Sequence, residues 1–238
     1  MVNPTWTFGV LLLPAFQLLD MAGTVDYLQV HTRDFLSILP PLNISVNPAV
    51  LDSAPIINWH YISNDFNPVN ATSGPPMIPT TTFDQAPALD YLMVPGPDPH
   101  AVLPEATIKF IQKVVKDPKF KGLLTVCTGS MAIAQSGVLD GHRVASNKVA
   151  LKAAALSGTI NHNVTWVGDR RWVVDGKIWS SGGVTSGIDL AAAFLEKMLG
   201  NGKIGKETRA LAQNMTEYKP NPDKPDPFRN ILKGIELN

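Results

Sequence analysis

The chain contains one cysteine, Cys127, in the stretch TVCTGSMAIAQSG at residues 125–137. An apolar run precedes it and small residues follow, which is the pattern of a buried strand that turns sharply into a helix. A thiol on such a turn lies at the carboxyl edge of a parallel sheet, where ligands bind in open α/β folds. The free N–H groups at the start of the helix favour the thiolate and lower the thiol pKa. We expect a nucleophile, although a free cysteine is also a common packing residue, and this stretch alone leaves both interpretations open.

The two residues after Cys127 extend this prediction. The N–H group of Thr128 is placed to stabilise a negative charge that develops on a substrate. Gly129 and the small residues behind it allow a tight turn and a closely packed helix. A nucleophilic thiol also needs a base or an orienting acid, so a partner must be sought elsewhere in the chain.

The candidate acids are Asp20, which follows the apolar stretch LLLPAFQLL, and Asp98 and Glu105, which follow the strand at 90–94. A place in the first turn of a helix explains Glu105 without a role in the site. Asp is also a good N-cap, so a helix start explains Asp20 equally well. The five histidines show no obvious spacing to Cys127, and the His and acidic residues show no metal-ligand spacing. No glycine-rich phosphate loop follows a strand. The sequence therefore predicts a thiol site that uses no metal and no organic cofactor.

Buried apolar runs alternate with helical patterns along the chain. Strands are predicted at residues 6–13, 56–62, 90–94, 121–126, 164–167, 172–174 and 175–183, and helices at 20–39, 105–117, 129–137 and 187–199. Residues 64–82 are rich in Asn, Pro, Ser, Thr and Gly, which predicts a long loop with a short hairpin. The alternation predicts an α/β fold with a mostly parallel sheet covered by helices on both faces.

Length and composition narrow the class of protein. The 238 residues predict one domain, 1–238, with a Pro-rich C-terminal tail over about residues 218–238 that lies on the surface. Twenty basic residues balance 20 acidic ones, which predicts neither a nucleic-acid nor a membrane partner. One cysteine excludes an internal disulfide. The apolar N-terminal stretch lacks a basic flank and is interrupted by Pro14, and no run is long enough to span a membrane, so we expect a soluble, cytoplasmic protein.

Three stretches together carry a resemblance to a known family. FGVLLLPAFQLLDMAGTVDYL, LLTVCTGSMAIAQSGVLDGHRVAS and WVVDGKIWSSGGVTSGIDLAAAFLE resemble the ThiJ/PfpI (DJ-one) superfamily of class I glutamine-amidotransferase-like proteins, and within it the isonitrile (isocyanide) hydratases. The resemblance implies a flavodoxin-like three-layer α/β/α sandwich and a homodimer. It also implies that Cys127 is the nucleophile, that Asp20 works with it, and that Thr128 contributes to the site.

The chain departs from the superfamily pattern at two places. Many members have a His after the elbow helix, where this chain has Asn147, which cannot act as a base. Members often have Pro-Gly-Gly after the middle strand, where the second glycine N–H helps to bind an oxyanion. Here the third residue is Pro97, which has no N–H. These departures predict a site adjusted for a different substrate.

The remaining candidate site residues have two interpretations each. Gly96 and Gly129 are predicted, with Thr128, to line the oxyanion site or the pocket. Thr185 and Ser186, in the phrase GGVTSG, either line the pocket together with Asn147 or shape a turn and a helix start, with Asp189 in the first turn.

The leading functional hypothesis is a cofactor-independent hydratase whose cysteine adds to a small electrophilic carbon, with Asp20 as acid and base, to give an N-substituted formamide. One alternative is a lyase, a cyclase or a glyoxalase-like enzyme that uses the same cysteine on another small metabolite. Another is a redox-responsive protein without turnover. A DNA-binding regulator is disfavoured, because the residues after the last helix of the domain are too few for a helix-turn-helix pair and the net charge is zero.

Overall fold

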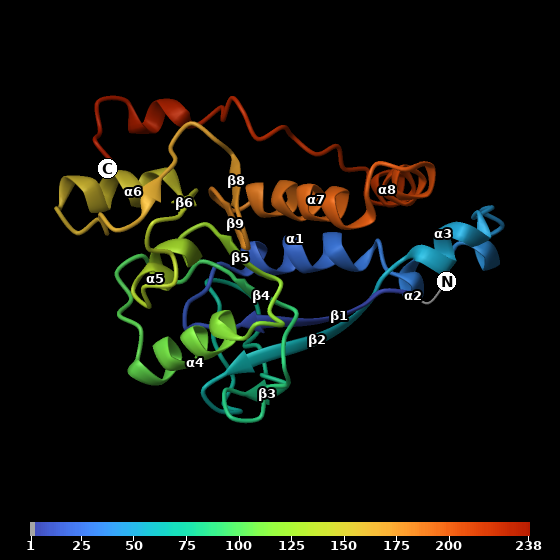
Figure 1. Ribbon diagram of the computed structural model, residues 1–238, viewed down its shortest axis with the longest axis horizontal. Coiled ribbons are helices and arrows are strands. Elements are labelled where there is room, and N and C mark those ends of the chain that lie inside the picture. Colours follow the sequence, from blue (N-terminus) through green and yellow to red (C-terminus); the bar gives the residue numbers. More distant parts are fainter. Residues whose placement is uncertain (1–2) are drawn as a thin grey trace.

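The structure, a computed structural model, describes residues 3–238 and is built around one large sheet (Figure 1). Its seven strands are ordered β3-β2-β1-β4-β5-β9-β8. They are β1 (Thr5–Leu11), β2 (Ile56–Ser63), β3 (Thr81–Thr82), β4 (Tyr91–Val94), β5 (Gly122–Val126), β8 (Trp172–Asp175) and β9 (Ile178–Ser181). All neighbours pair in parallel except β8 and β9. The predicted mostly parallel α/β sheet is confirmed.

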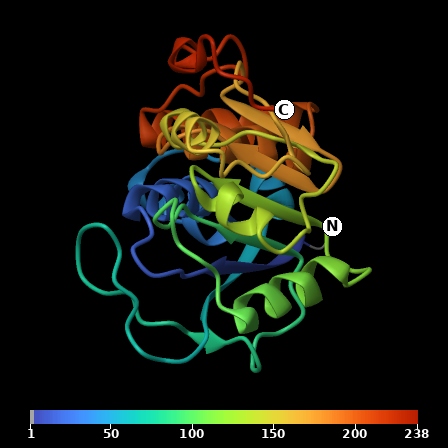
Figure 2. The same cartoon turned by 90° about the vertical axis from the view of Figure 1, so that its left-hand side faces the viewer.

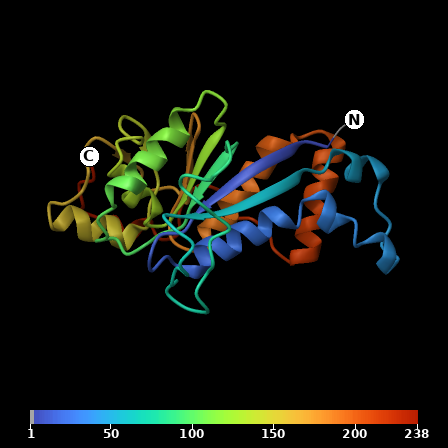
Figure 3. The same ribbon diagram turned by 90° about the horizontal axis from the view of Figure 1, so that it is seen from below.

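Helices cover both faces of this sheet and complete the three layers (Figures 1 and 3). On one face lie α1 (Leu18–Gln29) and α7 (Ser186–Leu199); on the other lie α4 (Glu105–Lys116) and α5 (Gly129–Ala134). Helix α6 (Lys148–Leu156) follows β6 (Arg143–Val144), which pairs in parallel with β7 (Thr165–Trp166) in a second, two-stranded sheet. No helix within residues 3–238 combines the length and apolar character needed to cross a bilayer.

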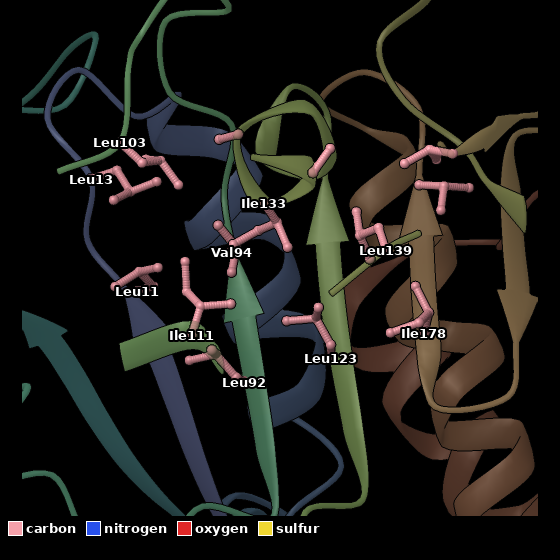
Figure 4. Close-up of a cluster of buried hydrophobic side chains, with 14 of the residues drawn as sticks. Leu11, Leu13, Leu92, Val94, Leu103, Ile111, Leu123, Ile133, Leu139 and Ile178 are labelled. Atoms are coloured by element: carbon pink, nitrogen blue, oxygen red, sulfur yellow. The ribbon is translucent and has the colours of Figure 1, made fainter. Parts of the chain in front are cut away.

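The alternation of side chains along β4 explains how one strand fills two cores. Leu92 and Val94 point into the cluster that α4 and α5 cover, where Leu123 and Ile111 also pack (Figure 4). Tyr91 and Met93 belong to the opposite cluster, under α1 and α7. Each of these apolar side chains that leaves water contributes roughly 1.5–3 kcal/mol to folding. Burial on both faces therefore fixes the strands whose carboxyl ends carry the candidate site.

The predicted helix over residues 20–39 is wrong in its length. Helix α1 ends at Gln29, and α2 (Arg33–Leu36) begins anew after Thr32, whose hydroxyl accepts a hydrogen bond from the N–H of Phe35. Thr is a good N-cap, and this local competition ends the continuous helix. The chain then passes through a 3₁₀ turn (Pro40–Leu42) and α3 (Pro48–Ser53), which packs against α8 (Lys203–Thr216).

The predicted loop at residues 64–82 projects beside the carboxyl edge of the sheet, which faces the viewer in Figure 2. Its hairpin is confirmed as an antiparallel bridge between Val69 and Met77. A second bridge, Phe16 to Ala71, ties the loop to the segment between β1 and α1. The loop therefore borders the candidate site.

The last part of the chain, residues 217–238, forms what we call the C-terminal segment. It begins where Glu217 ends α8 in the left-handed conformation, with φ of 48°. It then passes along α7 and reaches α6, where a 3₁₀ turn (Arg229–Leu232) packs (Figure 1). Asp226 and Leu232 are buried, so the segment is embedded at these points rather than resting on the surface.

Candidate active site

Cys127 lies on a strained turn between β5 and α5. Its φ is +58°, a region that residues other than glycine rarely adopt, and its N–H donates to the carbonyl of Gly182 at 3.0 Å. Gly129 makes the turn possible, because a Cβ there would lie 2.3 Å from the carbonyl oxygen of Val94. The predicted strand-to-helix elbow is therefore confirmed as a geometric feature. The cysteine side chain is only 7% exposed.

Asp20 lies against this turn, in the first turn of α1. The N-cap position belongs to Gln17, so the alternative interpretation of Asp20 as a cap is wrong. The carboxyl is fully buried, and its Oδ2 accepts a hydrogen bond from the N–H of Gly96 at 2.9 Å. The Cys127 thiol lies close enough to this carboxyl to lower its pKa, and Oδ1 of Asp20 has no hydrogen-bond partner among the described residues. The structure thus brings together the acid and the thiol that the sequence suggested as partners.

Burial dominates the electrostatics of this pair. It raises the pKa of Asp20 from 3.8 to about 7, although the Gly96 N–H and the Cys127 thiol oppose the shift. Burial, and then the negative charge of Asp20, also raise the pKa of the Cys127 thiol. The expected lowering of the thiol pKa by the helix start is therefore wrong, because a six-residue helix cannot offset the loss of solvent around the sulfur. Near neutral pH the pair favours a shared proton over two negative charges.

Three donors partly offset this rise by lowering the thiol pKa: the N–H groups of Thr128 and Val184 and the side-chain amide of Asn147. Val184 has a φ of +42°, an unusual value for a β-branched residue, in the turn after β9. Sequence reasoning missed Val184. The signal available was its place after the strand next to β5, since parallel strands end at the same edge.

Asn147 is held in one orientation by helix α6. Its Oδ1 accepts hydrogen bonds from the N–H groups of Val149 at 3.0 Å and Ala150 at 3.1 Å, as the N-cap of α6. Since the oxygen is occupied, the amide nitrogen turns toward Gly183 and the Cys127 sulfur. The residue at the place of the superfamily's His is thus a hydrogen-bond donor to sulfur, and it lines the cavity at Cys127, as predicted for a pocket residue.

Four other predicted site residues have roles that differ from the predictions in part. The N–H of Gly96 is already bound to Asp20, so it is no free oxyanion donor, although the residue lines the cavity. Gly129 packs against β4 and does not line that cavity. Thr185 accepts from Arg171 at 3.0 Å and Ser186 donates to the carbonyl of Gly183 at 2.9 Å, so both side chains are hydrogen-bonded at the turn and the start of α7. With Asn147 they also line a neighbouring cavity of about 230 Å³, which shares Asn147 and Val149 with the cavity at Cys127.

The departure at Pro97 also has a structural role. The hydroxyl of Thr128 donates to the carbonyl of Pro97 at 2.6 Å, so the side chain of Thr128 anchors the loop after β4. Its backbone N–H remains directed at the sulfur of Cys127. The proline thus supplies an acceptor where the superfamily pattern supplies a donor.

A cavity of about 360 Å³ opens at the sulfur, and its wall is mostly apolar. It is lined by Ala15, Gln17, Thr72, Gly96, Pro97, Asp98, Pro99, Cys127, Thr128, Asn147, Val149, Ala150 and Ala153. Asp98 is the charged residue of this wall. A larger cavity of about 570 Å³ shares Pro97 and lies under the 64–82 loop. Within residues 3–238, no cluster of three or more His, Cys, Asp or Glu residues could hold a metal ion.

The sequence of the chain is similar to those of several known proteins. Residues 43–197 match the DJ-1/PfpI family. The chain is 31% identical to the isonitrile hydratase of Pseudomonas putida over 216 residues, which cover 90% of this chain and 79% of the relative. It is 25% identical to the HTH-type transcriptional regulator GbdR of Pseudomonas aeruginosa over 98% of this chain but only 56% of the regulator.

Solved structures agree on the fold. A ThiJ/PfpI family protein from Pseudomonas syringae superposes with a TM-score of 0.69 at 21% identity, over 92% of this chain and 78% of that one. At this identity the likeness concerns the architecture, which is the flavodoxin-like sandwich expected from the sequence.

Proposed function

The chain belongs to the DJ-1/PfpI family, and on that premise we propose that it is a cofactor-independent hydratase that adds water to an isonitrile through Cys127 and Asp20. The observation that carries the proposal is the buried Asp20–Cys127 pair at the end of an apolar cavity. A carboxyl with a pKa of about 7 is suited to both donate and accept a proton near neutral pH. The 31% identity to an isonitrile hydratase supports the substrate class.

In the first step, Asp20 takes the proton of the Cys127 thiol and delivers it to the terminal carbon of the isonitrile as sulfur bonds to that carbon. The product is a thioimidate, and Asp20 returns to the carboxylate. The donors from Thr128, Val184 and Asn147 stabilise the thiolate while it forms. Burial keeps bulk water from competing with sulfur for the carbon.

In the second step, Asp20 accepts a proton from a water molecule whose oxygen adds to the thioimidate carbon. That proton passes to the nitrogen, and the bond between carbon and sulfur breaks. The second proton of the water returns to the Asp20–Cys127 pair, and the N-substituted formamide leaves. The sum is one isonitrile and one water consumed, with the enzyme unchanged.

The cavity wall indicates the kind of substituent on the nitrogen. Ala15, Pro97, Pro99, Ala150 and Ala153 contribute apolar surface near the sulfur. An uncharged alkyl or aryl isonitrile suits this wall, whereas a carboxylate-bearing one would meet Asp98 and find no cation among the lining residues.

The test is a substrate panel read by mass spectrometry, with alkyl and aryl isonitriles, methylglyoxal and larger metabolites. We expect formamides from the isonitriles and at least a thousandfold loss of turnover in Cys127→Ala and Asp20→Asn. Asp98→Asn, which removes a carboxylate from the same cavity, is the matched control and is expected to stay within about tenfold of the original. Full turnover by Cys127→Ala contradicts the mechanism, and turnover of methylglyoxal alone favours the glyoxalase-like alternative.

A second candidate function is ligand sensing without turnover, which the similarity to the regulator GbdR over 98% of this chain favours. In that case the cavity binds a small molecule and releases it unchanged. Calorimetric binding of an isonitrile or other panel member, with the compound recovered intact, would support sensing over hydration. A redox-responsive role instead predicts oxidation of Cys127 by mild peroxide with no activity on any panel member. The homodimer and the cytoplasmic location stay predictions.

A further inference from the structure

A set of polar contacts, one of them deeply buried, joins the C-terminal segment to the edge of the sheet that carries the sulfur. Asp226 pairs with Lys148 at 2.6 Å, and Asp223 pairs with Arg170. The N–H of Asn221 donates to Asp189 at 2.7 Å, and Asp189 is also paired with Arg171. These contacts connect residues 221–226 with side chains that lie far from them in the sequence.

The Lys148–Asp226 pair is the most deeply buried of these contacts to the segment. The two side chains are only 4% and 3% exposed, whereas those of Arg170 and Asp223 are 29% and 27% exposed. Lys and Asp are almost never buried to this degree unless paired, because removing two charges from water is costly. Lys148 uses a second donor on the carbonyl of Arg170 at 3.0 Å. The pair therefore holds the C-terminal segment and the start of α6 in a fixed relative position.

The Lys148–Asp226 pair lies next in the sequence to Asn147, one of the donors to the Cys127 sulfur. Lys148 directly follows Asn147, whose amide reaches Cys127. The ammonium of Lys148 packs on Gly182, where an added Cβ would lie 3.1 Å from Nζ, and the Gly182 carbonyl accepts the N–H of Cys127. The pair thus touches both the strand end and the helix start that surround the thiol.

The turn at Val184 is braced from the same side. Arg171 donates to the hydroxyl of Thr185 at 3.0 Å, directly after Val184. The backbone N–H of Arg171 donates to the carbonyl of Asp223 in the C-terminal segment. A strained φ such as that of Val184 persists only where the surroundings hold it, and here the C-terminal segment supplies part of that support.

We propose that Lys148 and Asp226 are positioning residues, which fix the Asn147 amide and the Val184 N–H on the Cys127 sulfur by joining the C-terminal segment to the 147–148 and 182–185 segments. Neither charge contacts the sulfur, and the pair is neutral overall, so its effect on the thiol is geometric. The charged group that faces the thiol itself is Asp20, from α1. The inference deepens the proposed function, in which Cys127 is the reactive thiol, but the position of the donors at the sulfur does not depend on which reaction the thiol performs.

Because the chain has one cysteine, alkylation of the intact protein reports on this thiol alone. The experiment measures the rate of reaction of the native protein with iodoacetamide between about pH 7 and 12, because the thiol pKa lies above its ordinary value, and intact mass follows the reaction. The variants are Asp226→Asn and the double replacement Lys148→Met with Asp226→Leu, which leaves no buried charge unpaired. The matched control is Asp223→Asn, which breaks the partly exposed pair of the same segment. Melting temperatures are recorded for all proteins.

We expect the double variant, which leaves no charge unpaired, to move the midpoint of the alkylation profile up by about one pH unit, which is a roughly tenfold loss of rate below the midpoint. Asp226→Asn is expected to show a smaller rise, because its unpaired Lys148 ammonium favours the thiolate. Asp223→Asn is expected to keep the original midpoint. A double variant that melts lower but keeps the original midpoint overturns the proposal, since the pair then only stabilises the fold. An equal shift in Asp223→Asn also overturns it, because any disturbance of the segment would then suffice.

If Asp226→Asn does not fold, the double variant Lys148→Met with Asp226→Leu removes both charges and leaves none unpaired. It is expected to fold and still show the raised midpoint, because the Arg170 carbonyl and Gly182 lose the ammonium that packs on them. An unshifted midpoint in the folded double variant refutes the inference. Alkylation needs no substrate, so it tests the positioning role separately from the hydratase mechanism. A shifted midpoint together with turnover in Cys127→Ala would contradict the mechanism and still support the positioning role.

Discussion

Replacement of Asp20 by Asn should make the protein more stable at neutral and alkaline pH, although it removes a central residue of the site. The folded state raises the pKa of this carboxyl from 3.8 to about 7 by burial. Asp20 thus binds its proton more tightly in the folded state than in the unfolded state. Its contribution to stability is fully present below about pH 4 and is lost as the pH rises through 7. Asn cannot ionise, and its amide keeps an oxygen for the Gly96 N–H, so Asp20→Asn lacks this loss.

The magnitude follows from the size of the shift. A shift of about three units corresponds to about 4 kcal/mol of stability between the low-pH and high-pH limits. Roughly 3 kcal/mol of this falls between pH 4.5 and pH 8, because the unfolded carboxyl is already mostly ionised at the lower value. For a chain of this size, that difference corresponds to a change in melting temperature on the order of 10 °C.

The assay is urea unfolding of the original protein and of Asp20→Asn at about pH 4.5, 6 and 8, with linear extrapolation to water. The stability advantage of Asp20→Asn should grow steadily with pH and level off above about pH 8. Asp98→Asn serves as control for the general loss of one negative charge at this edge of the sheet. If the difference between Asp20→Asn and the original does not change with pH, the carboxyl is not buried against the thiol as described, and the acid–base role loses its basis.

Three further outcomes follow from the geometry. Asn147→Ala should lose about 1 kcal/mol of stability in urea unfolding, because the helix cap is missing, and its thiol should be alkylated more slowly, as intact mass reports. Asn147→Asp should keep the cap but slow alkylation further, because it adds a negative charge beside the sulfur. Gly129→Ala should destabilise the fold by roughly 2–4 kcal/mol in urea unfolding, since its Cβ meets the Val94 carbonyl at 2.3 Å. Ala153→Leu should raise KM for bulky isonitriles and spare methyl isonitrile in steady-state assays, because it fills the apolar wall.

The central strands of the sheet could be predicted because they are buried on both faces. The runs at 90–94 and 121–126 agree with β4 and β5 to within about a residue, since a continuous apolar run bounded by turns has few other uses. The partly buried run at 56–62 agrees with β2 because it is rich in β-branched and aromatic residues. The break in the first helix could not be predicted in this way, because a cap at Thr32 competes with a pattern that continues past it. The strand-like stretch at 164–167 was predicted correctly, but its partner β6 in a separate sheet was not, since pairing is a tertiary property.

The candidate site, too, could be predicted from the sequence only in part. The sequence indicates which residues follow a strand, and this located Cys127 and Asp20. It does not indicate the direction of each N–H group, so Gly96 was assigned as a free donor although Asp20 already occupies it. Thr185 and Ser186 follow a strand as well, but their side chains line a neighbouring cavity.

The role of Asn147 depends on information that only the fold supplies. Read as a sequence change, an Asn where related proteins carry a His is the loss of a base. In the structure the amide oxygen is consumed by the start of α6, which leaves the amide nitrogen as a fixed donor toward sulfur. The amide donor lowers the thiol pKa without itself titrating, whereas the effect of a His on the thiol changes as the ring gains or loses a proton. In the proposed mechanism proton transfer therefore falls to Asp20, and we expect a pH–rate profile governed by the Asp20–Cys127 pair.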